Sequence, residues 1–156
     1  RSQNTVLFIG YQAQGTRGWN MVSVPLVLAD KTAGNVFPTA EAIYTWNPTT
    51  KSYVMPPTIE PCVAYWVAVL DEAVVPLAGT TVDEYVVDLV PGWHMLGSSY
   101  GSAAAIEDPR DAPAGSVGSF AYHWNPESKT YDYCTTLDSG AGYWIAASTH
   151  CLLEVS

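Results

Sequence analysis

One segment of the chain matches a nucleophile motif. Gly97–Gly101 reads GSSYG, which fits the pattern GxSxG with Ser99 at its centre. In α/β-hydrolases this serine lies at a turn between a strand and a helix and needs a histidine and an acid beside it. Here the motif occupies the place of a strand segment, VSVPL, in an earlier copy of the same pattern, and alternating helices are lacking. A serine hydrolase at Ser99 is therefore a distant alternative, and we expect no enzyme.

The histidines and carboxylates show no spacing that is typical of a metal or glycosidase site. A glycosidase needs two carboxyl groups at a defined separation, which nothing in this sequence fixes. Pro109 and Arg110 interrupt the acidic loop that could otherwise supply oxygen ligands to Ca²⁺. We predict no catalytic residue, no metal and no cofactor, and we expect the histidines to be partly exposed. The groups considered are His94, His123, His150, Glu107/Asp108/Asp111, Asp71/Glu72 and Asp83/Glu84.

The three cysteines form an odd set without a CxxC spacing, which argues against structural zinc. Cys134 and Cys151 flank one short apolar strand, so a disulfide between them is the prediction for a secreted protein. This bridge would leave Cys62 as a thiol or available to a partner chain. Three buried thiols are the alternative, because cysteine often behaves as a small hydrophobic residue.

The six tryptophans fall into two copies of one pattern. The pattern begins with GW, continues with a Y-x-WNP hairpin that ends in tyrosine, and closes with YW. Repetition at equivalent positions is what a duplicated core produces, because each ring buries a large apolar area. We therefore expect Trp19, Trp93, Trp66 and Trp144 to lie in the core. The equivalent pairs are Trp19/Trp93, Trp46/Trp124, Trp66/Trp144, Tyr44/Tyr122, Tyr53/Tyr131 and Tyr65/Tyr143.

Exposed aromatic rings would favour another function, because tryptophan and tyrosine faces stack on sugar rings. Tyr100 and Tyr133 are the candidates for sugar contact, since neither has a counterpart in the first copy. A carbohydrate-binding module is therefore the alternative to a purely structural role, and a glycan is a possible partner.

Strand signals dominate the elements that must position these residues. About ten to twelve short strands, with turns every 8–12 residues, predict an all-β fold. The duplication predicts two pseudo-symmetric tandem β-units, sandwich-like or barrel-like, of about five to six strands each. Residues 1–79 would form the first unit with an extra N-terminal strand at Val6–Tyr11, and residues 80–156 the second, in one compact body. The only helix candidate is Ser102–Glu107, which Pro109 stops.

Charge excludes several classes of partner. The net charge is −9, and the six basic residues form no cluster, so nucleic-acid binding is not expected. The apolar runs are too short to span a bilayer, and no membrane insertion is expected. Charged residues make up only 13% of the chain, which suits an extracellular or cell-surface setting.

The ordered motifs also resemble a known module. GWN-M-VS-VP, then Y-x-WNP…Y, then GYWI is similar to a β-rich module of secreted and cell-surface proteins of bacteria and archaea. The resemblance covers Gly18–Val75 and Gly92–Val155. It implies an extracellular accessory or scaffold role with no established catalytic set. The chain departs from the pattern at EPCVAYW in the first copy and at GSS in the second.

The first functional hypothesis is a non-enzymatic structural or interaction protein that associates with itself. An unpaired apolar strand edge is an association site, and pairing with the next subunit would give an open polymer. The N-terminal strand could pair within the chain or across to another molecule. We therefore predict a homo-oligomer or homopolymer, as a filament or surface-layer subunit. The predicted self-association residues are Val6, Leu7, Phe8, Ile9, Leu152 and Leu153.

Overall fold

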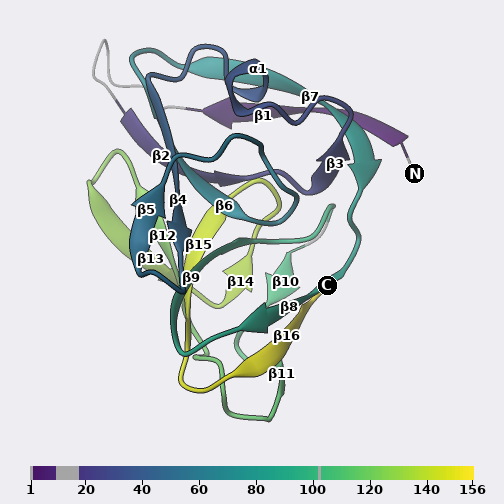
Figure 1. The fold of residues 1–156 in the computed structure, drawn as a ribbon, viewed down its shortest axis with the longest axis vertical. Helices are drawn as coiled ribbons and strands as arrows, with labels where there is room; N and C mark the ends of the chain where they lie inside the picture. Colours follow the sequence, from purple (N-terminus) through teal and green to yellow (C-terminus); the bar gives the residue numbers. More distant parts are fainter. Residues whose placement is uncertain (1, 10–17, 102) are drawn as a thin grey trace.

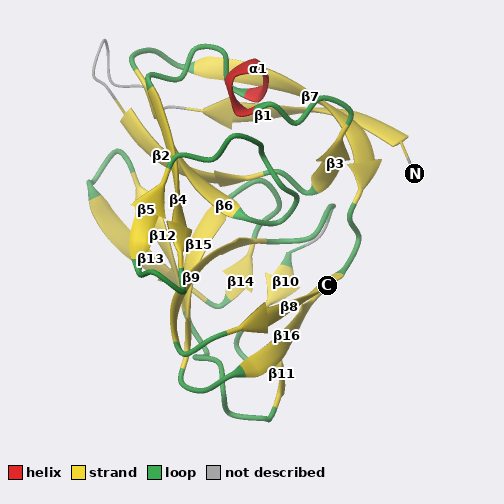
Figure 2. Ribbon diagram, in the orientation of Figure 1, coloured by secondary structure: helices red, strands yellow, loops and turns green. Residues whose placement is uncertain are grey.

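The computed structural model describes residues 2–9, 18–101 and 103–156 and shows an all-β fold, which confirms the predicted class (Figures 1 and 2). Two antiparallel four-stranded sheets have the same strand order in the two copies of the repeat. The first contains β2 (Gly18–Ser23), β6 (Ala64–Val69), β4 (Ala42–Asn47) and β5 (Ser52–Val54). The second contains β9 (Gly92–Gly97), β15 (Gly142–Ala147), β12 (Ala121–Asn125) and β13 (Thr130–Cys134).

Each repeat adds an outer three-stranded sheet, and these two sheets lie at the top and bottom of Figure 1. The upper one has the order β1 (Ser2–Ile9), β7 (Ala73–Thr81) and β3 (Leu26–Leu28). The lower one has the order β8 (Tyr85–Leu89), β16 (Cys151–Val155) and β11 (Arg110–Ala112). The strand before each GW strand thus pairs with the strand after each YW strand. The remaining elements are α1 (Ala33–Val36), β10 (Ala104–Ala105) and β14 (Thr136–Leu137).

Alternation along the strands gives each four-stranded sheet two buried faces. In β6, Tyr65 and Val67 face the core of the first repeat, whereas Ala64 and Trp66 face the second repeat. The second repeat has its own core, built around residues such as Tyr143 and Ile145. A third cluster between the sheets contains Met21, Ala64, Trp66 and Met95. This third cluster takes residues from both repeats.

Paired backbone contacts join the two sheets at equivalent positions. The Ser23 amide donates to Gly140 O at 3.0 Å, and the Gly97 amide donates to Cys62 O at 2.8 Å. Both acceptors have positive φ, 90° at Gly140 and 63° at Cys62. At Gly142 a Cβ would lie 2.8 Å from the Ala64 Cβ, so only glycine permits this approach. The repeats are therefore related by an approximate two-fold arrangement.

The two aromatic hairpins repeat each other in detail. The Asn47 side chain accepts from the Thr49 and Thr50 amides, and the amide of Lys51, with φ 54°, donates to Asn47 O at 2.8 Å. Asn125 and Lys129 form the same turn in the second hairpin. The Asn-Pro turns predicted from the sequence are confirmed, and they fix the register that places the hairpin rings.

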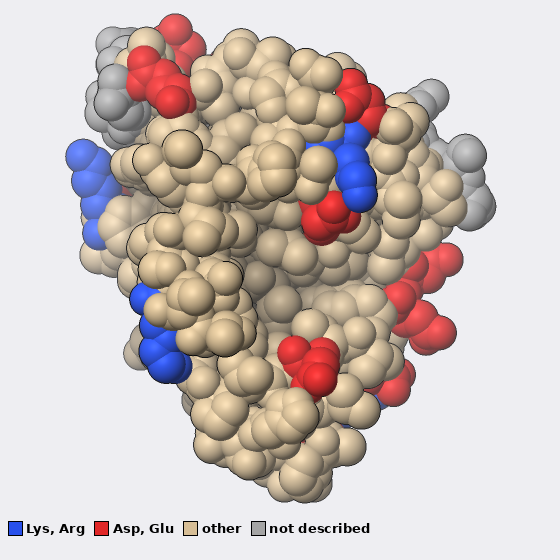
Figure 3. Space-filling model, viewed as in Figure 1, with Lys and Arg blue, Asp and Glu red and all other residues tan. Residues whose placement is uncertain are grey.

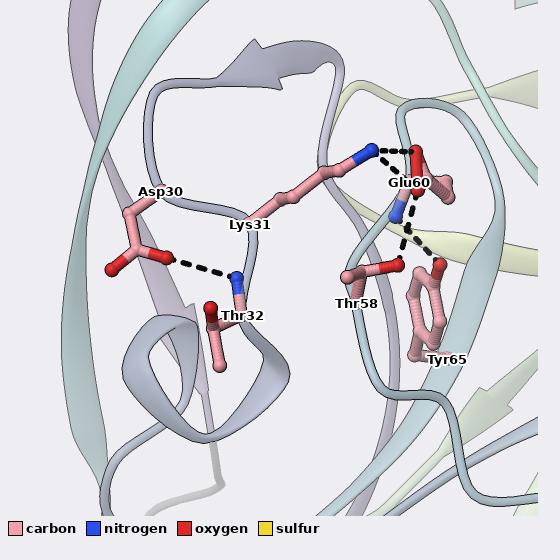
Figure 4. Close-up of polar contacts among 6 residues, drawn as sticks. All are labelled: Asp30, Lys31, Thr32, Thr58, Glu60 and Tyr65. Carbon is pink, nitrogen blue, oxygen red and sulfur yellow. Dashed lines mark hydrogen bonds and ion pairs between the residues drawn. The ribbon is translucent and has the colours of Figure 1, made fainter.

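A second local arrangement occurs in both repeats. The Tyr65 hydroxyl accepts from the Glu60 amide at 2.8 Å, and the Tyr143 hydroxyl accepts from the Asp138 amide at 2.8 Å. Figure 4 shows the first of these beside the Lys31–Glu60 ion pair, which spans 2.9 Å. Both tyrosine rings are buried, so each hydroxyl ties a loop to a core ring.

Several local predictions differ from the structure. Residues 103–107 are not helical, because Ala104–Ala105 form β10 paired with β14; Ser102 lies outside the described residues. The helix is α1, whose four residues end at Val36. Sixteen strands occur among the described residues, more than expected because several have two or three residues. Gly10 and Tyr11, assigned to the N-terminal strand, also lie outside the described part.

β1 pairs along its whole length with β7, from Ser2 opposite Thr80 to Ile9 opposite Ala73. The backbone of Val6–Ile9 is thus paired inside its own chain, which counts against self-association by a protruding strand.

β7 runs to Thr81 and crosses the predicted boundary between residues 79 and 80. A helix that is long and apolar enough to span a bilayer does not occur among the described residues.

Candidate functional site: two aromatic pockets

Aromatic rings from both repeats form two equivalent sets of contacts between the two sheets. Trp66 meets Trp124 with ring centroids 5.9 Å apart, and the equivalent pair, Trp144 and Trp46, is separated by 5.6 Å. Most of these contacts are edge-to-face, the geometry that the ring quadrupole favours. The other matched contacts are Trp19–Trp66 with Trp93–Trp144, Trp124–Tyr131 with Trp46–Tyr53, and Trp19–Tyr44 with Trp93–Tyr122.

These rings line two open pockets, with volumes of about 400 and 470 Å³. The first pocket is lined by Trp19, Tyr44, Tyr53, Trp66, Trp124 and Tyr131. The second pocket is lined by Trp93, Tyr122, Tyr131, Trp144, Trp46 and Tyr53. Each ring of the first pocket has its repeat equivalent in the second. The approximate two-fold arrangement of the fold therefore produces two copies of one site.

Four of the lining rings are well exposed: Trp19 at 39%, Trp93 at 46%, Tyr53 at 49% and Tyr131 at 44%. The predicted core position is therefore wrong for Trp19 and Trp93, whereas Trp66 is buried and Trp144 is half-buried. The reason is topological. β2, β5, β9 and β13, which carry the exposed rings, are the outer strands of their sheets. Rings on outer strands have neighbours on fewer sides.

Among the described residues, the polar groups that line the pockets belong to indole and phenol rings. The Trp144 Nε1–H donates to the Tyr131 hydroxyl at 3.2 Å. Burial raises the pKa of the Tyr53 phenol, the Trp66 side chain opposes this effect, and nearby Tyr131 raises the pKa further. The net effect favours the neutral phenol. In the part of the chain that the structure describes, no charged side chain lines either pocket, so the site offers apolar faces and hydroxyl groups.

The GxSxG segment forms no nucleophile elbow. β9 ends at Gly97, and the next element along the described chain is the short strand β10 rather than a helix. Ser99 is fully buried, and its hydroxyl has no hydrogen-bond partner among the residues that the structure describes. A histidine bonded to Ser99, which a hydrolase would need, is therefore lacking.

The histidines have structural partners at three separate places. His94 is buried and bonds to Val90 O at 2.7 Å, so the prediction of partial exposure is wrong for this residue. His123 is half-buried against Gly142 O, and His150 is exposed beside Asp88. Among the residues that the structure describes, no three histidine, cysteine, aspartate or glutamate side chains are grouped as metal ligands would be.

The acidic loop has structural contacts of its own. Asp111 Oδ2 accepts from the Val117 amide at 2.8 Å, and Val117 in turn forms an isolated bridge with Ala147 at the end of β15. Arg110 forms an exposed ion pair with Glu154 at 2.8 Å. These contacts bind the loop to the second repeat, and the two carboxylates involved are not directed at the aromatic pockets.

All three cysteines are free thiols, so the predicted Cys134–Cys151 disulfide does not occur in the structure. The two residues belong to different sheets. Cys134 ends β13 opposite Ala121, whereas Cys151 begins β16 opposite Leu89. Although the two cysteines flank the same strand in the sequence, the fold does not bring their side chains close enough to form a disulfide.

The other predicted contact residues lie outside both pockets. Tyr100 packs against the core of the first repeat, and Tyr133 is 73% exposed beside Phe120 and Tyr122. Leu152 is exposed on β16, but Leu153 is fully buried and cannot contact a partner.

Comparisons with protein-family models, curated proteins and solved structures found no match. The resemblance to a β-module of secreted proteins therefore stays a prediction. Function has to be argued from the pockets themselves.

Sequence reasoning missed the lining role of Tyr53, Tyr131, Trp46 and Trp124. The signal was present, because period-two alternation places Tyr44 with Trp46 and Tyr122 with Trp124 on one face of each hairpin strand. What the sequence lacked was the packing of each hairpin against the other repeat. That packing turns two flat aromatic faces into two pockets.

Proposed function

We propose that this chain is a non-enzymatic module that binds carbohydrate in the two aromatic pockets. The observation that carries the proposal is the pair of open, equivalent pockets whose described lining residues are all tryptophan and tyrosine. Aromatic residues with polar tips are suited to surfaces that are apolar on one side and wet on the other. Sugar rings have the same mixed character, with apolar C–H faces and hydroxyl edges.

Charge favours a neutral glycan over an anionic one. The described lining residues include no cation that would pair with a uronate or sulfate group, and the chain carries a net charge of −9. An anionic polymer would therefore meet long-range repulsion without a compensating contact. Figure 3 shows a surface on which charged residues are few and scattered. The low charged fraction also supports an extracellular or cell-surface setting for this activity.

The test is a glycan array followed by calorimetry with variants in the pockets. Trp19→Ala and Trp93→Ala remove exposed rings, so they disturb the shared core less than changes at Trp66 or Trp144 would. We expect the double variant to lose about 30-fold or more in affinity, the loss typical of aromatic residues that dominate binding. Phe120→Ala is the matched control, because Phe120 is an exposed ring outside both pockets. Equal binding by the double variant and the wild type would refute the proposal.

Self-association remains a second candidate, supported by a different observation. β1 is the outer strand of its sheet, and Val74, Val86 and Leu152 are exposed aliphatic residues on the outer sheets. Exposed apolar groups on strands are potential association sites. Light scattering over a concentration series would measure the mass, with Leu152→Ser compared with the wild type. A monomer at every concentration would exclude this candidate and leave glycan binding untouched.

A further inference from the structure

The two pockets have part of their lining in common. Tyr53 and Tyr131 line both of them, and each pocket takes four rings from one repeat and two from the hairpin of the other. The two tyrosines come from β5 and β13, the outer strands of the two sheets. The pockets are therefore adjacent, and neither is complete without both repeats.

From this arrangement we infer that the pockets are equivalent subsites for two units of one linear, uncharged glycan chain. The inference rests on the proposed carbohydrate binding and adds the form of the ligand. Each pocket presents three indole and three phenol rings, and the volumes of 400 and 470 Å³ are similar. Two sites of the same chemistry select the same unit. A polymer of one repeating unit supplies two such units at adjacent positions.

The chemistry of the lining restricts the unit further. With no charged side chain in either pocket over residues 18–101 and 103–156, recognition depends on stacking and on the hydroxyl groups of the tyrosines. Hexoses whose hydroxyls are all equatorial have C–H groups on both faces, so they match this lining best. Among linear neutral polymers, β-1,4-linked glucose has this property in every unit. Gluco-oligosaccharides of this linkage are therefore the probes of choice.

Two joined subsites give a dependence on ligand length. Once one unit is bound, its neighbour meets the second pocket at a high effective concentration, which raises affinity without any new kind of contact. A short ligand that fills one pocket gains nothing from the other. Affinity should therefore rise steeply at the length that first reaches both subsites, and the stoichiometry should be one chain per protein.

Calorimetry with glucose and with β-1,4-linked gluco-oligosaccharides of two, four and six units tests the inference. We expect the six-unit chain to bind at a ratio of one to one and at least about tenfold more tightly than glucose, which can fill only one pocket at a time. Trp19→Ala and Trp93→Ala should each reduce six-unit binding toward the level of glucose, by similar factors. Phe120→Ala should bind like the wild type, and near-ultraviolet circular dichroism should show that every variant is folded.

The outcomes separate this inference from the proposed function. If the six-unit chain binds no more tightly than glucose, or if two six-unit chains bind per protein, the joined subsites are refuted while glycan binding stands. Loss of binding in only one of the two tryptophan variants refutes their equivalence. Binding of a charged glycan in place of the glucans refutes the form of ligand inferred here. If neither the glucans nor any arrayed glycan binds, but a proline-rich peptide does, both the inference and the proposed function fail.

Discussion

The Ser23 side chain occupies the space that a side chain on Gly97 would need. A Cβ built on Gly97 would overlap both the Cβ and the Oγ of Ser23. The two residues are equivalent in the two repeats, and they meet where β2 and β9 lie close to the approximate two-fold axis that relates the repeats. Ser23 Oγ also donates to Ala141 O at 2.6 Å. At this junction only one of two equivalent positions can carry a side chain.

We therefore predict that Gly97→Ser destabilises the protein by about 1–3 kcal/mol, the usual cost of overpacking a tight site. Ser23→Gly should cost about 1–2 kcal/mol, because it loses the hydrogen bond and places glycine in a strand. Chemical denaturation followed by tryptophan fluorescence measures both changes in the free energy of unfolding.

The exchanged double variant, Ser23→Gly with Gly97→Ser, is the control for this prediction. It restores one side chain at the junction, so its cost should be clearly smaller than the sum of the two single costs. Strict additivity would show that the two positions do not compete for the same space.

The matched tyrosines Tyr65 and Tyr143 give a second prediction. Each hydroxyl accepts a backbone amide at 2.8 Å, so Tyr65→Phe and Tyr143→Phe should each cost about 1 kcal/mol of unfolding free energy. The rings belong to separate repeat cores, and the two effects should therefore add. Tyr133→Phe is the control and should change stability by less than about 0.5 kcal/mol, because its ring is on the surface. A large difference between the two core variants would contradict the structural equivalence of the repeats.

His94 predicts how stability depends on pH. Burial lowers the pKa of its imidazole, Val90 O opposes this effect, and nearby Lys51 lowers the pKa further. The folded state therefore binds a proton less readily than the unfolded state, whose histidine pKa is about 6.5. The stability contributed by neutral His94 is complete above that value and is lost as the pH falls through the lower folded pKa.

His94→Asn tests this dependence with the residue of the other repeat, because Asn20 is buried at the equivalent position. The variant should lose less unfolding free energy than the wild type between pH 7 and pH 5. His150→Gln is the control, since His150 is exposed beside Asp88. Identical pH profiles for His94→Asn and the wild type would disprove the role of His94.

The fold class and the duplication could be predicted from the sequence because both depend on local signals. The Asn-Pro turns and the repeated tryptophans are visible within a few residues of each other. Burial at the outer strands could not be predicted in the same way. Trp19 and Trp66 belong to the same repeated set, yet one is exposed and the other buried, because β2 is an outer strand and β6 is not.

The pockets were beyond the reach of the sequence for a related reason. They depend on which ring of one repeat meets which ring of the other, as in the contact of Trp66 with Trp124. That choice follows from the tight junction at Ser23, Ala64 and Gly142, where two backbones approach closely. Strand periodicity gives the face on which a ring lies, but it does not give the face of the other sheet that covers it.

The free thiols give the last prediction. Burial raises the pKa of Cys62 to about 12, and it also raises the pKa of Cys134, where Asp132 and Asp138 add to the effect. Only the thiolate attacks a disulfide reagent, so these thiols should react slowly at pH 8 in the folded protein. Cys134 is half-buried and should react first, whereas Cys62 and Cys151 are buried and should react only on unfolding.

Titration with an aromatic disulfide reagent, in buffer and then in guanidinium chloride, measures both the rates and the number of thiols. Without a reductant, the unfolded protein should give three thiols, because all three cysteines are free in the structure. One thiol would instead reveal a disulfide, and if the remaining thiol maps to Cys62, the bridge that the sequence suggested between Cys134 and Cys151 is reinstated. Cys134→Ser separates the kinetic claim from the count, since this variant should lose the early phase and keep two thiols that react only on unfolding. An early phase that persists in Cys134→Ser would mean that Cys62 or Cys151 is reached from solvent, contrary to their buried positions.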